Sequence, residues 1–576
     1  MKRTAFELTL ISVLLWLAIG ITPCVRFASA QDFEAIIIQA DGSIEGTDKI
    51  QRNENVYTLT SDIHCSIDTA EALIFILKDN IILDGAGYTI SSEGNGICIH
   101  MESRQNVVVK DFKIQNFGSG ISFGFATNNP IMEGEPPPYI LAQNNQIINN
   151  QITSYYWGIT LENANATTIS DNIITATNPK YGVSLGNCNF TSFFNNKLYG
   201  GSLYIGISNE NLIVDNTIDG KSLTILNQDS NRIIDGAGQV ILQECSNITI
   251  KNVNPSADLR VAIQLSDTNN SKIVNCSGRT TLSNSHYNVL SNNFLSGIGS
   301  IGYDSQPAIT LSASNFNLIF ENQITKCDDE GISLTGSDFN HIYNNVVADC
   351  DVGIWLLGSK NNSLYQNILE GDNFGIKLAF EMLANVSPFS YNNSIFENTI
   401  NSCDQGIHLF SADENKVFRN SISNCTAYGI FLCCADGNMF YNNNFLANDM
   451  QVYEEHSVWT GMGLEDYFSE NNTWDAGSTI GGNFWSNYKG IDTDGDGMGD
   501  TPYIIDALNQ DNYPVIFPFE IPSSAQFPSP TPTPSEETNS TSDGFPTTLF
   551  IVSIIIVAVI SVALLFYFKK RKSQAH

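Results

Sequence analysis

The central part of the chain alternates apolar and polar residues over very short runs. In CDVGIWL, which starts at Cys350, Ile354 and Leu356 would point to one side of an extended strand and Trp355 to the other. Similar phrases begin at Cys327, Asp372, Cys403 and Cys425. Alternating runs of two to five residues, separated by Asn, Asp and Gly, are typical of short β-strands and not of helices. The pattern therefore predicts an all-β fold.

The Gly-Ile pairs within these phrases recur at a nearly fixed period. They lie at Gly331, Gly353, Gly375, Gly406 and Gly429, at steps of 22 or 23 residues except for one step of 31. The long step contains an insertion, Ala379 to Tyr391. A period in the twenties predicts a solenoid in which each repeat is one coil.

Residues at equivalent positions should then stack about 4.8 Å apart, the spacing of neighbouring strands. Two asparagine columns follow: Asn317, Asn340, Asn362, Asn393 and Asn415, and Asn322, Asn345, Asn367, Asn398 and Asn420. Their amides can donate to one coil and accept from the next. Cys327, Cys350, Cys403 and Cys425 form another column. Stacked parallel side chains seldom reach disulfide geometry, which favours buried thiols over disulfides.

Several motifs resemble the NosD family. They are LDGAGYTI from Leu83, DGKSLTILNQ from Asp219 and the closing GGNFWSNYKGIDTDGDGMGDTPYIID from Gly481. The resemblance implies a right-handed, single-stranded parallel β-helix, grouped with the carbohydrate-binding and sugar-hydrolase (CASH) repeats. It extends over residues 56–518, and the stalk and anchor described next resemble surface-exposed versions.

Both ends of the chain indicate export and membrane attachment. Residues 1–30 have the order of a signal peptide, and residues 547–568 are long and apolar enough for a transmembrane helix. The basic tail, 569–576, predicts a cytoplasmic C-terminus. Between them we expect a lead-in and cap (31–55), β-helix repeats (56–450), a C-terminal cap (451–520) and a Pro/Ser/Thr-rich stalk (521–546). The oligomeric state is left open.

Charge and sequons add two expectations about partners. The 27 Lys+Arg against 60 Asp+Glu give a formal net charge of −33, which excludes nucleic acid as a probable class of partner because its phosphates are repelled. Asn-x-Ser/Thr sequons, compatible with export, occur for example at Asn165, Asn189, Asn247, Asn361, Asn392 and Asn471. Because the chain is rich in Asn, many of these would arise by chance.

DTDGDGMGD, Asp492 to Asp500, matches the front of a calcium-binding loop. Asp492, Asp494, Asp496 and Asp500 occupy positions 1, 3, 5 and 9, and Gly497 occupies position 6. Position 12 is Tyr503 rather than Glu, so a standard EF-hand is excluded. We expect a structural calcium ion here; a solvated acidic turn is the alternative.

The outward positions beside the Gly-Ile pairs offer a binding face. Trp355, Lys377, His408 and Phe431 should share one column, where aromatic rings can stack on sugars and polar groups can bond hydroxyls. Half-exposed strand residues under lateral loops are the alternative. Asp328, Asp351 and Asp404 run beside this column as candidate catalytic acids. In turns, however, Asp usually bonds backbone amides.

The association of the NosD name with copper delivery finds little support in the residues. Copper prefers imidazole, thiolate and thioether ligands, but the histidines are isolated. Cys433 and Cys434 are adjacent, and on an extended strand their side chains would face opposite sides.

The sequence therefore favours a surface protein that binds a polysaccharide or glycan, or serves as an envelope scaffold. A polysaccharide hydrolase or lyase of the CASH type is the alternative, and a copper-delivery factor fits the residues less well than either. The β-helix is expected outside the membrane.

Overall fold

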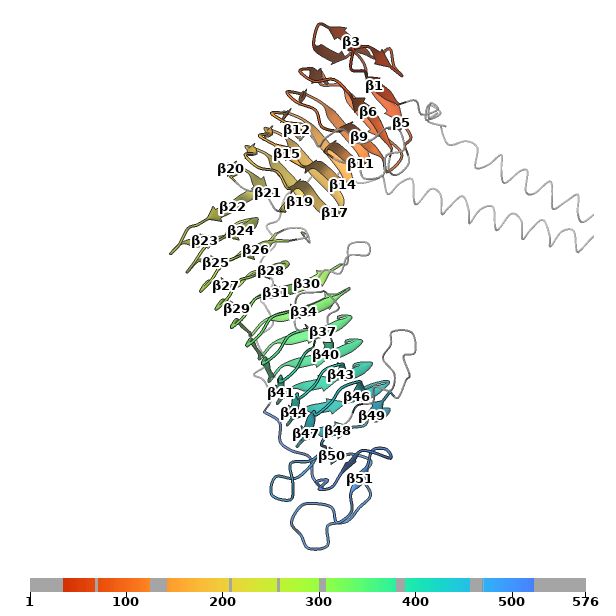
Figure 1. Ribbon diagram of the computed structural model, residues 1–576, viewed down its shortest axis with the longest axis vertical. Helices are drawn as coiled ribbons and strands as arrows, with labels where there is room; N and C mark the ends of the chain where they lie inside the picture. The colour runs from red at the N-terminus through yellow and green to blue at the C-terminus, as the bar shows by residue number, and fades with distance from the viewer. Residues whose placement is uncertain are drawn as a thin grey trace, which may run out of the picture. The chain divides into compact units, whose positions relative to one another are not determined.

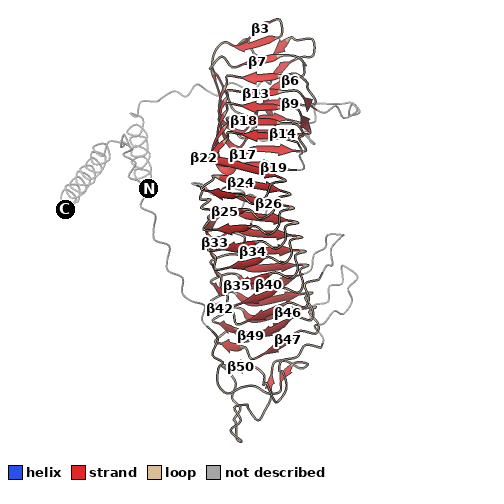
Figure 2. Ribbon diagram, turned by 90° about the vertical axis from the view of Figure 1, so that its left-hand side faces the viewer, coloured by secondary structure: helices blue, strands red, loops and turns tan. Residues whose placement is uncertain are grey.

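The computed structural model describes residues 35–67, 71–124, 142–206, 210–255, 259, 261–299, 307–379, 389–455, 469 and 471–522. The predicted signal peptide, transmembrane helix and tail lie outside these residues, as do all but two residues of the stalk and residues 380–388 of the insertion. The described residues form strands, turns and loops only (Figure 2). None of their segments is a helix long and apolar enough to cross a membrane.

The strands fall into four long sheets and two small ones within the described residues (Figure 1). Sheet 1 contains β1 (Ile36–Ile38), β2 (Ile44–Glu45), β5 (Ile63–Cys65), β6 (Ala72–Ile76), β8 (Thr89–Ser92), β9 (Ile97–Met101), β11 (Lys113–Phe123), β14 (Gln151–Glu162), β17 (Ile173–Gly186), β19 (Lys197–Ile205), β21 (Thr217–Ile218), β22 (Lys221–Asn227), β24 (Gln239–Gln243), β26 (Ile263–Ser266), β28 (Thr280–Ser283), β31 (Ile309–Ser312), β34 (Glu330–Thr335), β37 (Val352–Leu357), β40 (Phe374–Ala379), β43 (Gln405–Phe410), β46 (Tyr428–Cys433) and β49 (Met450–Glu454).

Sheet 2 contains β3 (Ile50–Asn53), β4 (Val56–Leu59), β7 (Ile82–Asp84), β10 (Val108–Lys110), β13 (Gln146–Ile148), β16 (Thr168–Ser170), β18 (Ser192–Phe194) and β20 (Leu212–Val214). Sheet 3 contains β23 (Ile233–Asp235), β25 (Thr249–Lys251), β27 (Lys272–Val274), β29 (Val289–Ser291), β32 (Leu318–Phe320), β35 (His341–Tyr343), β38 (Ser363–Tyr365), β41 (Ser394–Phe396), β44 (Lys416–Phe418) and β47 (Met439–Tyr441).

Sheet 4 contains β30 (Phe294–Ile298), β33 (Gln323–Cys327), β36 (Val346–Ala348), β39 (Ile368–Glu370), β42 (Thr399–Asn401), β45 (Ser421–Ser423), β48 (Asn444–Leu446) and β50 (Phe484–Trp485). The two small sheets are formed by β12 (Ala142–Gln143) with β15 (Ala164–Asn165), and by β51 (Tyr503–Ile504) with β52 (Gln510–Asp511).

Each regular coil visits three sheets in turn, and its strands pair in parallel with those of the next coil. In one coil the chain runs through β35, β36 and β37, which pair with β38, β39 and β40. Ile332, Ile354 and Ile376 lie in one register, as the repeat predicts, and each is fully buried. The fold is therefore a parallel β-helix whose core is a stack of aliphatic side chains.

The glycine of each Gly-Ile pair is required by close backbone contact. A Cβ atom added to Gly353, Gly375 or Gly406 would lie 2.6 Å from the carbonyl oxygen of the glycine in the next coil. No real Cβ contact is that short, so the position excludes every larger residue unless the coils move apart. The need for glycine at each of these contacts explains why the same short sequence motif recurs.

Both predicted asparagine columns form hydrogen-bonded ladders. In one typical step, Asn367 donates from its backbone N and from Nδ2 to Asn398 Oδ1, both at 3.0 Å, and from Nδ2 to the Ile342 carbonyl at 2.8 Å. Since these side chains are buried, the ladder satisfies groups that would otherwise be costly to desolvate. At the C-terminal end, Asn483 donates its backbone N to Asp511 Oδ2 at 2.7 Å.

The coils form two stacks with a break that the repeat pattern did not predict. The first stack ends with β20 in sheet 2, and the second begins with β22 in sheet 1 and β23 in sheet 3. Between them β21 pairs in parallel with β19 but antiparallel with β22, so the strand direction reverses. The buried Gln239 amide bonds both the N–H (2.9 Å) and the C=O (2.8 Å) of Leu203, in place of a neighbouring strand.

Candidate functional site

The four predicted ligand-binding residues lie in one outward column of sheet 1. The strand register pairs Trp355 with Lys377, Lys377 with His408, and His408 with Phe431. The three residues Trp355, Lys377 and His408 are half-buried, whereas Phe431 is buried at 8% exposure. Parallel pairing holds these side chains on one face, so the geometry of the predicted column is confirmed, although the face is more covered than an open platform would be.

Lys377 lies between two aromatic rings. Its Nζ atom is 5.1 Å from the centroid of Trp355 and 4.5 Å from that of Phe374, which are cation–π distances. Burial lowers the pKa of Lys377, while the nearby carboxylates of Asp351 and Glu330 oppose that shift. The amine is therefore a partly desolvated donor rather than a free surface charge.

The indole N–H of Trp355 is buried and finds no hydrogen-bond acceptor among the described residues. A buried tryptophan N–H normally has an acceptor, because losing its bond to water carries a desolvation cost. Ser333, the preceding residue of the column, has a small side chain and is 7% exposed. The Trp355 N–H is thus a buried donor without an acceptor, which a ligand oxygen could reach only if the groups that cover it moved aside.

His408 and Phe431 use their ring faces on each other. Their rings stack at 4.4 Å with an interplanar angle of 6°, and Phe374 meets His408 edge-on at 5.2 Å. His408 Nδ1 is 2.8 Å from Gln405 Oε1. Burial, with a smaller effect of the Lys377 charge, lowers the pKa of His408 to about 3, so the ring is neutral at ordinary pH. These two residues form a wall of the face and offer a sugar little free ring surface.

Three neighbours from the adjacent outward column complete this face. Glu330 (5% exposed), Phe374 and Gln405 lie in the adjacent outward column, where Glu330 pairs with Val352 and Phe374 with Gln405. Their signal was their position, directly before each Gly-Ile pair. The face therefore combines an acid, an amine, an amide and aromatic rings within successive coils.

The three candidate catalytic acids are exposed at the neighbouring corner. Asp351 Oδ1 accepts a hydrogen bond from Asn373 Nδ2 at 2.6 Å, and Asp404 Oδ1 accepts one from Thr426 Oγ1 at 2.7 Å. Asp328 lies at the same turn, one coil before Asp351. Each of the two bonds links one coil to the next, and its donor is a side chain rather than the backbone amide that a turn aspartate usually binds.

The cysteine column contains a residue that sequence reasoning passed over. Asp372, 1% exposed, occupies the position between Cys350 and Cys403, and its Oδ1 accepts the Cys350 N–H at 2.8 Å. Its Oδ2 is buried without a partner. Burial is the main cause that raises the pKa of Asp372 to about 9, so this carboxyl is protonated at neutral pH.

The four cysteines of the column are free thiols, as expected, and so are the other seven cysteines that the structure describes. Burial raises the pKa of Cys403, and raises that of Cys425 to about 12, which disfavours the thiolate that metals require. The expectation that Cys433 and Cys434 face opposite sides is wrong: their Sγ atoms are 3.6 Å apart. The reason is that Cys434 leaves the strand in a left-handed conformation, with φ of 54°.

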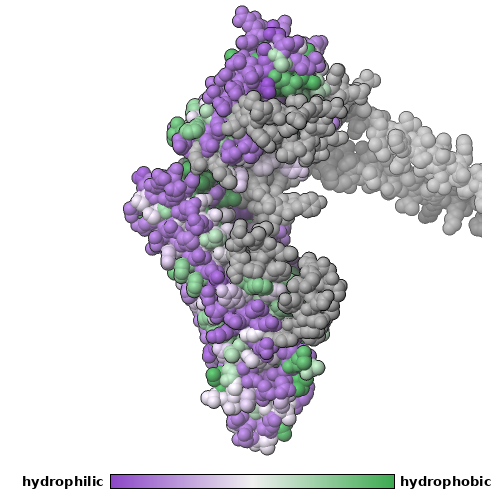
Figure 3. All heavy atoms as spheres, viewed as in Figure 1, coloured by the Kyte–Doolittle hydropathy of each residue, from purple (hydrophilic) through white to green (hydrophobic). Residues whose placement is uncertain are grey.

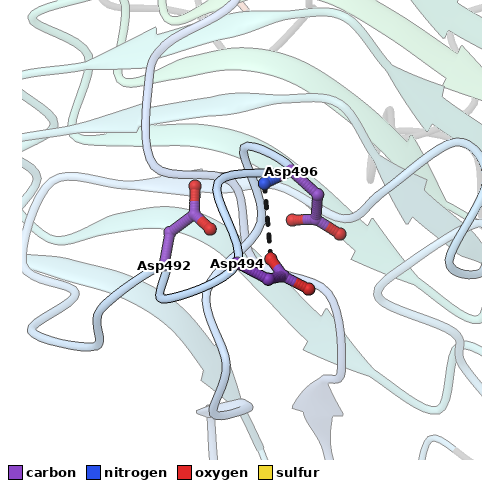
Figure 4. A group of neighbouring side chains, drawn as sticks. All are labelled: Asp492, Asp494 and Asp496. Carbon is purple, nitrogen blue, oxygen red and sulfur yellow. Dashed lines mark hydrogen bonds between the residues drawn. The ribbon is translucent and has the colours of Figure 1, made fainter.

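The predicted calcium loop brings three of its four acids together (Figure 4). Asp492, Asp494 and Asp496 each place a carboxylate oxygen within 4.8 Å of the others, the one such cluster of potential ligands found among the described residues. Asp496 N donates to Asp494 Oδ1 at 3.3 Å. Asp500 instead accepts the Thr493 N–H at 3.1 Å and also bonds the Thr493 hydroxyl. Carboxylates suit calcium rather than copper.

An aromatic ladder on sheet 3 escaped the sequence reasoning altogether. Six rings stack in succession with centroids 4.9 to 5.1 Å apart: Phe320, Tyr343, Tyr365, Phe396, Phe418 and Tyr441. A recurring four-residue motif in the sequence signals this ladder. It begins with Asn and any residue, continues with an aliphatic residue or Phe, and ends with Phe or Tyr, two residues before each asparagine of the second ladder. Because neighbouring rings occupy each other's faces, this ladder stabilises the stack and exposes only ring edges to a ligand.

A groove with a volume of about 470 Å³ lies on the first stack, far from the predicted residues in sequence. Asp84, Asp111 and Asp171 line it together with Asn149 and Lys113. Lys110 bridges two of these acids, at 2.6 Å from Asp84 and 2.7 Å from Asp111, and this contact lowers the pKa of Asp111. In the view of Figure 3 the described surface is mainly hydrophilic, in keeping with the excess of acidic residues.

The fold and these sites define a parallel β-helix protein with a mixed polar and aromatic face. The family model described as "Periplasmic copper-binding protein (NosD)" matches residues 207–378 and 384–490, just under half of the chain. The match begins at the break between the stacks and includes the second stack and most of its cap. The chain is therefore a NosD-like, right-handed parallel β-helix protein, as its motifs indicated.

Comparison with curated proteins gives no match. Solved structures similar to this chain include a double mutant of the periplasmic alginate epimerase AlgG, with 15% identity over 67% of this chain and 83% of that one, at a TM-score of 0.21. An Azotobacter vinelandii mannuronan C-5 epimerase module shares 12% identity over 71% and 87%, at 0.19. A tailspike protein of an E. coli bacteriophage, in complex with a pentasaccharide, shares 11% over 68% and 69%, at 0.25. Scores this low carry no argument about this chain.

Proposed function

We propose that the chain binds a polysaccharide or surface glycan through the sheet 1 face formed by Glu330, Trp355, Phe374, Lys377 and His408. The observation that carries this proposal is the buried Trp355 N–H without an acceptor beside the partly desolvated Lys377 amine. Two donors next to aromatic rings suit a sugar, whose hydroxyl oxygens accept hydrogen bonds and whose C–H face packs on rings.

The charge around this face favours a neutral glycan. Lys377 is its one strongly basic group, while Glu330 lies within the face and Asp328, Asp351 and Asp404 lie beside it. Uronic-acid polymers would meet these carboxylates and the overall charge of −33. The expected role is a binding module or envelope scaffold that an export signal and a C-terminal anchor hold outside the membrane.

Catalysis is the weaker alternative. A hydrolase or lyase needs carboxyl groups held in a groove with different pKa values, whereas Asp351 and Asp404 are exposed and bonded to side chains of the next coil. Copper delivery is not proposed, because the one group of three or more His, Cys, Asp or Glu ligands found among the described residues consists of aspartates. A structural calcium ion in the Asp492 loop remains a proposal.

A glycan array probed with the purified full-length protein tests the function. For any glycan that binds, Trp355→Ala should weaken the affinity up to about tenfold, the equivalent of about 1.4 kcal/mol from the lost ring contact. Trp355→Phe keeps a ring but removes the N–H, and should lose part of the affinity. Lys416→Ala, at an exposed position on sheet 3, is the matched control. Unchanged binding by Trp355→Ala would refute the assigned face.

A further inference from the structure

One corner of the second stack places residues in a left-handed backbone conformation in coil after coil. This corner column lies two residues before each sheet 3 strand, and five successive members have φ between 54° and 59°: Tyr287, Phe316, Phe339, Asn361 and Asn392. Asparagine is favoured there, because its short side chain tolerates the left-handed region. Aromatic residues are disfavoured at such a position, yet three consecutive coils carry one.

The three aromatic residues form an exposed stack. Tyr287 and Phe316, and then Phe316 and Phe339, lie 5.0 Å apart with interplanar angles of 5°. Their exposed fractions are 55%, 41% and 44%. Phe316 covers one face of Phe339, and the next member of the column on the other side is Asn361. The stack therefore ends with a phenyl face directed along the column toward Asn361.

The amide of Asn361 has a fixed orientation in this column. Its Oδ1 accepts a hydrogen bond of 2.5 Å from Asn392 Nδ2, on the following coil. Elsewhere in the column, Asn247 Nδ2 likewise donates to the preceding coil, to Asn231 Oδ1 at 2.7 Å. The member of the corner column one coil before Asn361 is Phe339, whose side chain offers no acceptor. Asn361 Nδ2 therefore makes no hydrogen bond among the described residues. The nitrogen thus lies on the side of the phenyl ring.

Asn361, Asn362 and Ser363 form an N-glycosylation sequon. We propose that Asn361 carries an N-linked glycan whose first sugar packs on the exposed face of Phe339. Asn361 Nδ2 would attack the anomeric carbon of a sugar carried on a polyprenyl phosphate or diphosphate. The N–C bond forms as the C–O bond to the phosphate breaks, the lipid phosphate leaves and the amide loses one proton.

The sequon by itself also has a purely structural explanation. The corner favours Asn361 by its left-handed φ, the buried ladder requires Asn362, and an outward strand position accommodates Ser363. What this explanation leaves out is the strained, exposed phenyl group next to the free nitrogen. The sequon at Asn392 repeats the same backbone geometry, but its preceding neighbour is Asn361 rather than an aromatic residue, which makes it the natural comparison.

Mass spectrometry of glycopeptides, from the full-length protein purified from the cells that produce it, tests the modification. The peptide with Asn361 should carry added sugar mass, and Ser363→Ala should abolish that mass while leaving Asn361 in place. Asn361 without sugar in the mature protein would overturn the proposal. Because the readout is mass, it is independent of whether the Trp355 face binds a glycan.

Melting temperatures test the contact with Phe339. The glycosylated protein should melt higher than its Ser363→Ala form by roughly 1 °C, as one sugar–aromatic contact would give in a protein of this size. Phe339→Ala should remove this difference while the sugar mass remains. The matched control, Ser394→Ala, removes the sequon at Asn392 and should change the melting temperature by a similar amount with or without Phe339. A glycan effect that survives Phe339→Ala would overturn the packing.

Discussion

Asp372→Asn should stabilise the protein, and more so as the pH rises. Asp372 is almost fully buried in the cysteine column, with one oxygen bonded to the Cys350 N–H and the other without a partner. At the equivalent position of a later coil, Asn448 accepts the Cys425 N–H at 3.0 Å. An asparagine therefore fits this turn and keeps the backbone hydrogen bond.

The magnitude follows from the raised pKa. Burial, first, and the neighbouring Cys350, Asp349 and Glu370 raise the pKa of Asp372 from 3.8 to about 9. For an acid whose pKa is raised in the folded state, the folded protein is most stable below pH 3.8 and loses stability as the pH rises toward 9. At 1.36 kcal/mol per pH unit, the loss between pH 3.8 and pH 7 is on the order of 4 kcal/mol. The side-chain amide of Asn does not titrate in this pH range, so the variant does not lose this stability.

Denaturant unfolding at pH 4 and at pH 7 measures the effect. The Asp372→Asn variant and the wild type should have similar free energies of unfolding at pH 4, and the variant should exceed the wild type by several kcal/mol at pH 7. Asp404→Asn, an exposed acid one coil away, controls for the loss of one negative charge. A gap between Asp372→Asn and wild type that is the same at both pH values would refute a buried, protonated carboxyl.

Three further predictions concern the coils and the cap. Gly375→Ala should destabilise by about 2 kcal/mol or more in denaturant unfolding, because the added Cβ lies 2.6 Å from a carbonyl oxygen; a neutral result would show that the coils can separate. Replacing Asp494 and Asp496 together by Ala should lower the melting temperature only when calcium is present, and an equal loss in chelator would leave the loop a mere turn. Asp511→Ala should lower the melting temperature of the cap, because it removes the carboxylate that accepts the Trp485 indole N–H at 2.8 Å. The fluorescence of Trp485 should then change more on mild heating than in the wild type. An unchanged melting temperature would contradict the role of Asp511 as the end of the asparagine ladder.

Much of the second stack was predictable from sequence because a parallel β-helix ties every position to the residue one period away. The Gly-Ile pairs, both asparagine ladders and the column from Trp355 to Phe431 follow from one spacing, and the strand register reproduces them. The six rings of the aromatic ladder and Asp372 lie at the same period, but the Asn and Cys columns alone do not reveal them. The membership of a column is therefore a property of the sequence.

Tertiary structure decided what each column can do. Spacing could not show that His408 and Phe431 consume each other's ring faces, or that Trp355 keeps a buried N–H without an acceptor. Nor could it place the break near Gln239, where the chain reverses a strand and an amide side chain replaces a strand partner. Sequence determines which residues are neighbours along the axis, since that depends only on period. Side-chain orientation, burial and the end of a stack depend on all the groups around a position, and only the packed molecule brings those together.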